Sequence, residues 1–391
     1  MSILALTRLL DEQADLTTIS TWWPCVFRVR ATGAEILRWV HQHLDCTLAS
    51  APAPVAPAAA EVSIVLSADS SALRQVGAAV ARIRTRRVQG FPGQYWRRGV
   101  LEGLTVWYRA AEGATKDEAQ AIVQIGPADW LAIASSGEAA ALSGLRLARE
   151  LLRAELACRP AVTVHAALVA GTDLGGLLLV GDAGVGKTTL ALGLAQRRGY
   201  VVSTDQTVVV RGIAGRPVGL GAPHANRVGV GTVRTLTREI DEPHVALLRR
   251  DTRSFDGQPP TKAWVTPLET EVLYGIASAP LARVDAIVIL GAGRDLVAIA
   301  CPRSPGEGLP RGLAQQCRTA DPLLGGFWLA LPRDAHLDDP GPKGPAGLIA
   351  GLPTAELSWD PRHHAPDDAL AALRRVLPAR RSGEVAAHAA D

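Results

Sequence analysis

Alternating and helical patterns of apolar residues predict a small α+β region in the N-terminal part of the chain. Strands with one buried face are expected at residues 26–30, 62–66, 86–88, 100–108 and 121–125. Apolar residues recur at helical spacing over residues 34–44 and 75–83, which predicts two helices. Gly103 and Gly113 are expected to lie in turns between the later strands.

An amphipathic helical pattern over residues 139–158 separates this region from the rest of the chain. Leucines fall on one face and arginines on the others, and Pro160 ends the pattern. We therefore expect an α+β domain over residues 1–135 and a second, larger domain over residues 136–380, onto which this helix packs. Residues 381–391 are expected to form a flexible tail.

Longer apolar runs predict an α/β architecture for the second domain. Strands are expected at residues 162–170, 177–180, 201–205, 208–210, 286–290, 327–331 and 355–359. A strand at 296–300 is expected to pair with 286–290 across a glycine-containing turn. Helices are expected over 190–196 and, at the end of the domain, over 367–377. Strands that alternate with helices in this way are typical of α/β domains.

A complete G-x-x-x-x-G-K-T phosphate loop lies between one of these strands and the helix that follows. The loop comprises Gly181, Asp182, Ala183, Gly184, Val185, Gly186, Lys187, Thr188 and Thr189. Its glycines allow the backbone to wrap around phosphate groups, and the loop amides and the helix N-terminus attract an anion. Lys187 is expected to reach the β- and γ-phosphates of ATP, and the Thr188 hydroxyl to ligate Mg²⁺. The strand–loop–helix context favours nucleotide binding over a glycine-rich turn without a ligand.

A magnesium–nucleotide site also requires a carboxylate at the end of a strand. The apolar strand 286–290 is followed by Gly291 and offers none, whereas the strand after the loop helix ends in Asp205. Asp205 is therefore the candidate both for binding Mg²⁺ and for accepting the proton of a hydroxyl group. The alternative for this residue is a surface or turn-capping role.

Composition and charge restrict the classes of function to be considered. The net charge of +3 over 391 residues is too small to indicate nucleic-acid binding, and no helix-turn-helix pattern or basic stripe stands out. The five cysteines are scattered and form no C-x-x-C pair, so we expect reduced thiols in a cytoplasmic protein. The N-terminus lacks a signal-peptide pattern, and no run of about eighteen apolar residues predicts a membrane-spanning helix.

The order and spacing of three segments resemble the HPr kinase/phosphorylase family. These segments are residues 164–169, which contain His165, the loop 181–188, and residues 199–205, which end in Asp205. The resemblance implies an HPr kinase-like phosphate-loop domain with a mixed, strongly twisted sheet, and ATP and Mg²⁺ as cofactors. The family usually has paired aspartates where this chain has a threonine followed by Asp205. The resemblance therefore implies that one carboxylate serves both metal and acceptor, or that another residue substitutes.

The leading functional hypothesis is an ATP-dependent kinase that transfers the γ-phosphate to a hydroxyl group of a peptide, a protein or a small molecule. Its catalytic candidates are Asp205, Lys187, His165 and Arg227. For His165, a role as a hydrogen-bonded core residue is an equal alternative. Arg234 and Lys262 are further cations able to neutralise transition-state charge or to hold an acidic acceptor, although each alone is more often a solvated side chain.

The competing hypothesis is a nucleotide-binding ATPase or regulatory module that recruits a partner through its N-terminal domain. In both cases the N-terminal domain is the candidate for recognising the acceptor or partner. Its segment 91–98, rich in arginine and aromatic residues, either binds an acidic or peptide partner or, as the favoured interpretation, forms core and rim of the domain. The charged segment 247–258 is a candidate flap over the site. The oligomeric state is left open, and a homo-oligomer fits the sequence.

Overall fold

In a computed structural model, the chain forms two compact units. The structure describes residues 2–44, 60–91, 94–110, 119–157, 159–212, 215–221, 226–237, 262–302, 309–317 and 347–378. Four sequence predictions lie outside these residues: the turn at Gly113, the flap 247–258, the strand 327–331 and the tail 381–391.

The first unit is built on an eight-stranded mixed sheet. Its strands are β1 (Leu16–Trp22), β2 (Cys25–Ala31), β3 (Ala60–Ser67), β4 (Arg86–Phe91), β5 (Gln94–Leu101), β6 (Leu104–Arg109), β7 (Gln120–Gln124) and β8 (Asp129–Ala134). Their order across the sheet is β1-β2-β3-β8-β7-β6-β5-β4. The β2–β3 and β3–β8 pairs are parallel and the others are antiparallel. The predicted turn at Gly103 is confirmed, since Gly103 lies between β5 and β6 with a φ of 83°.

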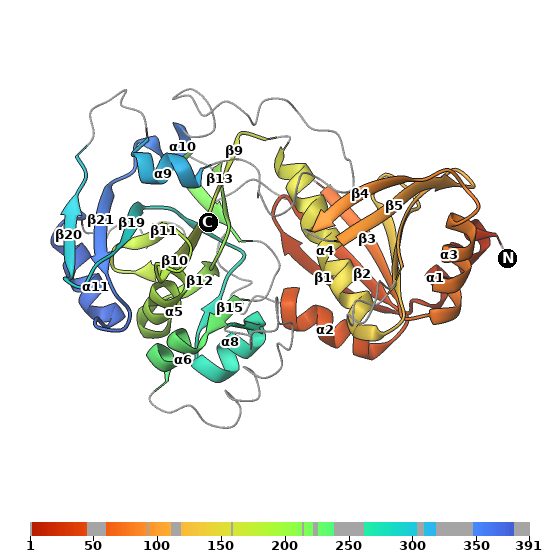
Figure 1. The fold of residues 1–391 in the computed structure, drawn as a ribbon, viewed down its shortest axis with the longest axis horizontal. Coiled ribbons are helices and arrows are strands. Elements are labelled where there is room, and N and C mark those ends of the chain that lie inside the picture. The colour runs from red at the N-terminus through yellow and green to blue at the C-terminus, as the bar shows by residue number, and fades with distance from the viewer. Residues whose placement is uncertain are drawn as a thin grey trace, which may run out of the picture. The chain divides into compact units, whose positions relative to one another are not determined.

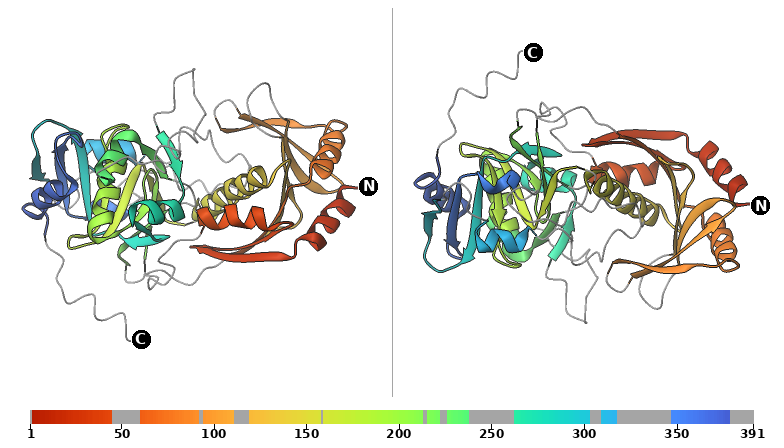
Figure 2. Two further views of the ribbon diagram at one scale, coloured as in Figure 1. Left: turned by 90° about the horizontal axis from the view of Figure 1, so that it is seen from below. Right: turned by 90° about the horizontal axis from the view of Figure 1, so that it is seen from above.

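Four helices cover the two faces of this sheet. They are α1 (Ile3–Gln13), α2 (Ala34–Leu44), α3 (Ser70–Val80) and α4 (Gly137–Ala157). Figure 2 shows α1 and α3 on one side of the bent sheet and α2 and the yellow α4 on the other. Leu6 and Val76 of the first pair pack with Leu131 of β8 in a buried core. On the other face the rings of Trp107 and Trp130 lie 5.8 Å apart and are almost fully buried.

Helix α4 belongs to the first unit, which differs from the sequence prediction. It packs against α2, β3, β7 and β8, and a Cβ atom added at Gly144 would lie only 2.5 Å from a methyl group of Leu66 in β3. The predicted boundary after residue 135 therefore falls inside this unit, and the helix is part of the first unit and not of the second. An amphipathic pattern shows that a helix has a buried face, but not which sheet covers it.

The second unit contains a seven-stranded mixed sheet and two smaller sheets. The large sheet has the order β17 (Ala277–Ser278), β12 (Tyr200–Ser203), β10 (Ala166–Thr172), β11 (Gly175–Val180), β19 (Ala286–Ala292), β21 (Thr354–Trp359) and β20 (Val297–Ala300). A four-stranded sheet has the order β18 (Leu281–Arg283), β14 (Pro217–Leu220), β13 (Thr207–Arg211) and β9 (Ala161–Val164). The two-stranded sheet pairs β15 (Asn226–Gly229) with β16 (Lys262–Val265).

The central strands β10 and β11 of the large sheet are buried on both faces, whereas the edge strand β20 is largely exposed. The helices of this unit are α5 (Lys187–Arg198), α6 (Val230–Leu236), α8 (Pro267–Tyr274), α9 (Arg311–Gln316), α10 (Gly347–Ala350) and α11 (Pro366–Arg374). One core joins the sheet to α5, α6, α8 and α11, and the other joins it to the four-stranded sheet, α9 and α10. Figure 1 shows α5 and α6 on one side of the sheet, with α9 and α10 on the other. The mixed α/β architecture predicted for this part of the chain is confirmed.

Three details of the predicted strands change. The stretch 162–170 is two strands, β9 and β10, which belong to different sheets and are separated at His165. The strand expected to end at Asp205 ends two residues earlier, so this aspartate lies in the bend after β12. The strand 296–300 pairs with β21 and not with β19, because β21 inserts between them as a parallel neighbour of β19. Among the described residues, no helix is long and apolar enough to cross a membrane.

The placement of α4 predicts which N-terminal fragment folds. A fragment of residues 2–158 should unfold cooperatively in urea, whereas a fragment of residues 2–135 should not. Loss of α4 removes the buried side chains of Leu147 and Leu152, each worth about 1.5–3 kcal/mol, from a domain whose net stability is on the order of 5–15 kcal/mol. Circular dichroism during urea titration measures both transitions. Equal midpoints for the two fragments would contradict the assignment.

Candidate functional site

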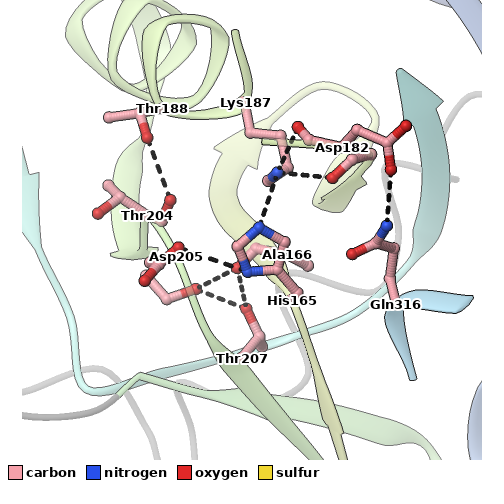
Figure 3. A network of polar contacts seen from close by, with 11 residues as sticks. His165, Ala166, Asp182, Lys187, Thr188, Thr204, Asp205, Thr207 and Gln316 are labelled. Carbon is pink, nitrogen blue, oxygen red and sulfur yellow. Dashed lines mark hydrogen bonds and ion pairs between the residues drawn. The ribbon is translucent and has the colours of Figure 1, made fainter. Parts of the chain in front are cut away.

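Three strand ends meet at one edge of the seven-stranded sheet. β10 runs antiparallel to β11 and β12, and its first residue, Ala166, lies opposite Val180 at the end of β11. Ser203, the last residue of β12, also pairs with β10. The start of β10 and the ends of β11 and β12 therefore share an edge. This geometry brings His165, the phosphate loop and Asp205 together, as Figure 3 shows.

The phosphate loop has the backbone conformation that its glycines permit. Gly184 and Gly186 have φ values of 86° and 97°, in the left-handed region that favours glycine. A Cβ atom at Gly186 would also lie 3.0 Å from Nε1 of Trp359. Helix α5 begins at Lys187, and no side chain caps its N-terminus. Its first amides are therefore available to an anion.

The ammonium group of Lys187 is held by the loop and by the residue that precedes β10. Nζ donates hydrogen bonds to the carbonyl oxygens of Gly181 at 2.6 Å and Asp182 at 3.0 Å, and it lies 3.1 Å from Nε2 of His165. Only 6% of Lys187 is exposed. Because a buried ammonium is stable only when its donors have partners, these contacts keep the positive charge inside the loop.

His165 connects Lys187 to Asp205. Its Nε2 faces the ammonium group, and its Nδ1 lies 3.5 Å from Oδ1 of Asp205. An ammonium group only donates, so Nε2 accepts, which assigns the proton of a neutral imidazole to Nδ1, facing the carboxylate. The side chains of His165 and Asp205 are 37% and 51% exposed. His165 is thus a partly exposed member of the site and not a core residue.

A buried polar network fixes the segment that carries Asp205. The hydroxyl of Thr188 donates to the carbonyl oxygen of Thr204 at 3.2 Å, and the hydroxyl of Thr204 donates to Oδ1 of Asn226 at 2.9 Å. Asn226 donates in turn to the hydroxyl of Thr270 at 3.1 Å. Thr204 is only 3% exposed, so its side chain serves this network. Asp205 therefore supplies the carboxylate at this strand end.

Gln316 of α9 is a contact residue that sequence analysis did not identify. Its side-chain Nε2 donates to Oδ1 of Asp182 at 3.1 Å. Its backbone carbonyl oxygen accepts a hydrogen bond from the backbone N–H of His165 at 2.9 Å. One residue therefore ties the phosphate loop to the start of β10. Gln316 lies 134 positions after Asp182 and is not part of any motif, so the sequence carries no signal for it.

Trp359, at the end of β21, supports the loop from another side. Its Nε1 donates to the carbonyl oxygen of Val185 at 3.3 Å, and the residue is 1% exposed. Together with Pro361, it occupies the space beside Gly186 that any larger residue would require. The apolar pattern predicts the strand 355–359 but carries no signal for its contact with the loop.

Asp360 directly follows β21 and is a second carboxylate at a strand end. Because β21 runs parallel to β19, the two strands end at the same edge of the sheet. Oδ1 of Asp360 accepts from the backbone N–H of Arg362 at 2.9 Å, and Oδ2 accepts from Nη2 of the same arginine at 2.7 Å. These hydrogen bonds hold the pKa of the Asp360 carboxyl well below its usual range. Both oxygens are therefore occupied by a neighbouring residue, unlike those of the half-exposed Asp205.

The described contacts of this network include none of the other predicted cations. Arg234 is exposed on α6. Arg227 and Lys262 lie in the paired strands β15 and β16, and their side chains lie outside the described part of the chain. The catalytic role of Arg227 stays a prediction.

Thr188 and Asp205 are oxygen donors of the kind that Mg²⁺ prefers. Within the described ranges, no group of three or more His, Cys, Asp or Glu residues is arranged to hold a metal ion. A magnesium ion bound with a nucleotide needs fewer protein ligands, because phosphate oxygens and water complete its coordination. The two residues contact the same short segment, since Thr188 bonds the carbonyl of Thr204, and they fit such a site.

Comparison with known proteins adds a distant structural likeness. No protein-family model matches the chain, and no curated protein matches it. Among solved structures, the Hpr(Ser) kinase/phosphatase from Coxiella burnetii is 15% identical over a match that covers 55% of this chain and 88% of that chain, with a TM-score of 0.28. The relationship is distant, and we draw no functional conclusion from it.

The contact between Trp359 and the loop predicts an effect on nucleotide binding. Trp359→Phe keeps an aromatic ring but removes the hydrogen bond to Val185, a bond worth about 0.5–1.5 kcal/mol. The Kd for a non-hydrolysable ATP analogue should rise by about twofold to tenfold in isothermal titration calorimetry. The control Trp39→Phe, on α2 of the first unit, should leave this Kd unchanged. Equal Kd values for all three proteins would exclude a supporting role for Trp359.

Proposed function

We propose that this protein is an ATP-dependent kinase that transfers the γ-phosphate to a hydroxyl group. The acceptor is a serine of a peptide or protein, or the hydroxyl group of a small molecule. The observation that carries the proposal is the chain of contacts from Lys187 through His165 to Asp205 beside the phosphate loop. Binding of Mg²⁺ and nucleotide alone would account for the carboxylate of Asp205, but not for the imidazole of His165 held between that carboxylate and Lys187.

The phosphate groups and the metal have separate sets of ligands in this proposal. The loop amides and Lys187 would hold the β- and γ-phosphates, and Thr188 and Asp205 would hold Mg²⁺. When bound, the metal supplies neutralisation of charge on the phosphate oxygens. The buried network beneath Thr204 keeps Thr188 and Asp205 in place, so little reorganisation is needed when substrate binds.

The transfer step places a proton acceptor beside the attacking hydroxyl. The acceptor oxygen forms a bond to the γ-phosphorus while the bond from that phosphorus to the bridging oxygen of ADP breaks. The hydroxyl proton passes to the carboxylate of Asp205. Nδ1–H of His165 orients that carboxylate, and Lys187 neutralises negative charge on the phosphates. Most of the rate enhancement then comes from positioning and charge neutralisation, as is general for phosphoryl transfer.

The proposed role of the first unit is to recognise the acceptor. It has its own core and contains no phosphate loop. Its long, mixed sheet offers extended strands at both edges, which suit contact with a polypeptide.

Lys187→Ala tests the phosphate-loop assignment and the kinase proposal together. The protein is incubated with ATP labelled at the γ-phosphate and with candidate peptides, proteins and small alcohols. The wild type should label an acceptor, whereas the folded Lys187→Ala variant should lose transfer, because the positive charge at the loop is gone. Label found only in free phosphate would favour the ATPase alternative. Wild-type turnover in the variant would exclude this site.

Asp205→Asn tests the proton acceptor separately from nucleotide binding. The substitution keeps the side-chain shape but removes the base, a loss that typically costs about a hundredfold to ten-thousandfold in rate. Turnover at saturating Mg²⁺ should fall at least about a hundredfold, while an ATP analogue still binds through Lys187 and the loop amides. Asp360→Asn is the matched control and should retain turnover, because Arg362 occupies that carboxylate. Turnover of Asp205→Asn within a few-fold of wild type would place the base elsewhere.

A further inference from the structure

Six arginines are concentrated at the β4 edge of the first unit. They are Arg82, Arg84, Arg86, Arg87, Arg97 and Arg98. Four of them oppose one another in the β4–β5 hairpin: Arg86 lies opposite Arg98, and Arg87 opposite Arg97. Like charges at directly opposed positions of neighbouring strands destabilise a sheet. The hairpin therefore has a charge pattern that stability alone does not explain.

Three of these arginines line an open cavity of about 400 Å³. Its lining includes Arg84, Arg86, Arg98 and Val100, and Val100 is 63% exposed. The Nε atom of Arg98 is buried and has no hydrogen-bond partner among the described residues. Burial and the neighbouring charge of Arg86 both lower the pKa of Arg98. A donor that is buried without a partner and faces positive charge would be stabilised by an anion.

No ion pair neutralises these charges in the part of the chain that the structure describes. Other arginines of the same unit do have such partners: Arg28 pairs with Glu61, and Arg30 with Asp11. Among the described residues, the arginines of β2 therefore have ion-pair partners, whereas those at the β4 edge have none. The described residues supply no ion-pair partner for these arginines, and guanidinium groups pair best with carboxylates and phosphates in a forked geometry.

The shape of the surface favours an extended polypeptide over a small anion. β4 is the last strand of the sheet, so the backbone groups on its outer side pair with no strand among the described residues. Such an edge can accept a further strand from a bound peptide. Arg87 lies 3.5 Å from the ring centroid of Tyr95, so the opposite face of the hairpin offers a guanidinium held flat against an aromatic ring. Both faces of an added strand would therefore meet arginine.

We propose that the β4–β5 hairpin binds an extended acidic segment of a polypeptide, with its backbone along β4 and its carboxylates paired with Arg84, Arg86 and Arg98. This segment belongs to the phosphate acceptor, an assignment that rests on the proposed kinase function. Binding itself needs no ATP and no residue of the phosphate loop. The acceptor class is then a protein or peptide that carries an acidic stretch, and not a small alcohol.

Fluorescence anisotropy with the full-length protein tests the binding. The probe is a fluorescein-labelled decapeptide of alternating glutamate and threonine, and a lysine–threonine decapeptide provides the opposite charge. The glutamate peptide should bind, with an affinity that falls as salt is raised, and the lysine peptide should not. The double variant Arg86→Gln/Arg98→Gln should bind the glutamate peptide at least about tenfold more weakly. The control Arg38→Gln, exposed on α2, should bind within about twofold of wild type.

Two further measurements separate lost contacts from lost folding. Removal of opposed like charges should leave the melting temperature of the double variant equal to or above that of wild type. Arg86→Lys/Arg98→Lys keeps both charges but loses the forked donors, and it should bind with intermediate affinity. Equal binding by wild type and both double variants would overturn the proposal.

The mode of binding and the class of partner are tested with matched ligands. A glutamate–threonine peptide methylated on alternate backbone nitrogens should lose affinity if it adds to β4, and unchanged affinity would exclude strand addition. A ten-nucleotide single-stranded DNA or pyrophosphate that binds this hairpin while the peptide does not would overturn the choice of a polypeptide. Peptide binding by a wild-type protein that transfers phosphate to no acceptor would support the docking surface and contradict the proposed kinase function. Phosphate transfer to an acceptor whose binding no acidic peptide inhibits would support the proposed kinase function and contradict the docking surface.

Discussion

The buried ammonium group of Lys187 is the constraint around which the second unit's site is arranged. A buried charge without partners costs several kcal/mol, and here the acceptors come from the loop itself and from the residue before β10. The loop, β10 and β11 must therefore stay in register at one sheet edge. The imidazole of His165, which accepts a hydrogen bond from Lys187, also contacts Asp205. The contact that stabilises the buried ammonium group therefore also positions the carboxylate. Stability and chemistry depend on the same contacts.

The sheet edge is held in place by packing on both faces of the sheet. Leu177 and Leu179 of β11 face the core shared with α5, while Leu178 and Val180 face the core shared with the four-stranded sheet. A strand buried on both faces cannot slip by one residue without exposing apolar side chains or burying polar ones. Contacts from distant segments, such as Gln316 and Trp359, then fix the loop that follows β11.

The positively charged side chains of the two units differ in whether residues of the same chain supply their partners. In the second unit, Lys187 is buried and its partners belong to the same chain. At the β4 edge of the first unit, arginines oppose arginines, and Arg98 buries a donor that no described residue satisfies. A charge satisfied within the fold organises a site, whereas a charge left unsatisfied at a surface indicates a partner outside the fold. The first arrangement suits a phosphate group that binds and leaves, and the second suits a stable docking segment.

The sequence by itself determined the local features of this protein. The phosphate loop, the strand before it, the helix after it and the candidacy of Asp205 all follow from residue types at fixed spacing, because loop conformation and helix initiation are short-range properties. The mixed α/β class of the second unit also follows from periodicity. The tertiary structure alone decided the break at His165, the insertion of β21 between β19 and β20, and the packing of α4 on the first unit. It also decided the contacts of Gln316 and Trp359 with the loop. Periodicity shows that a face is buried but carries no information about which distant segment covers it, since that choice depends on shape and hydrogen bonding between elements far apart in the chain.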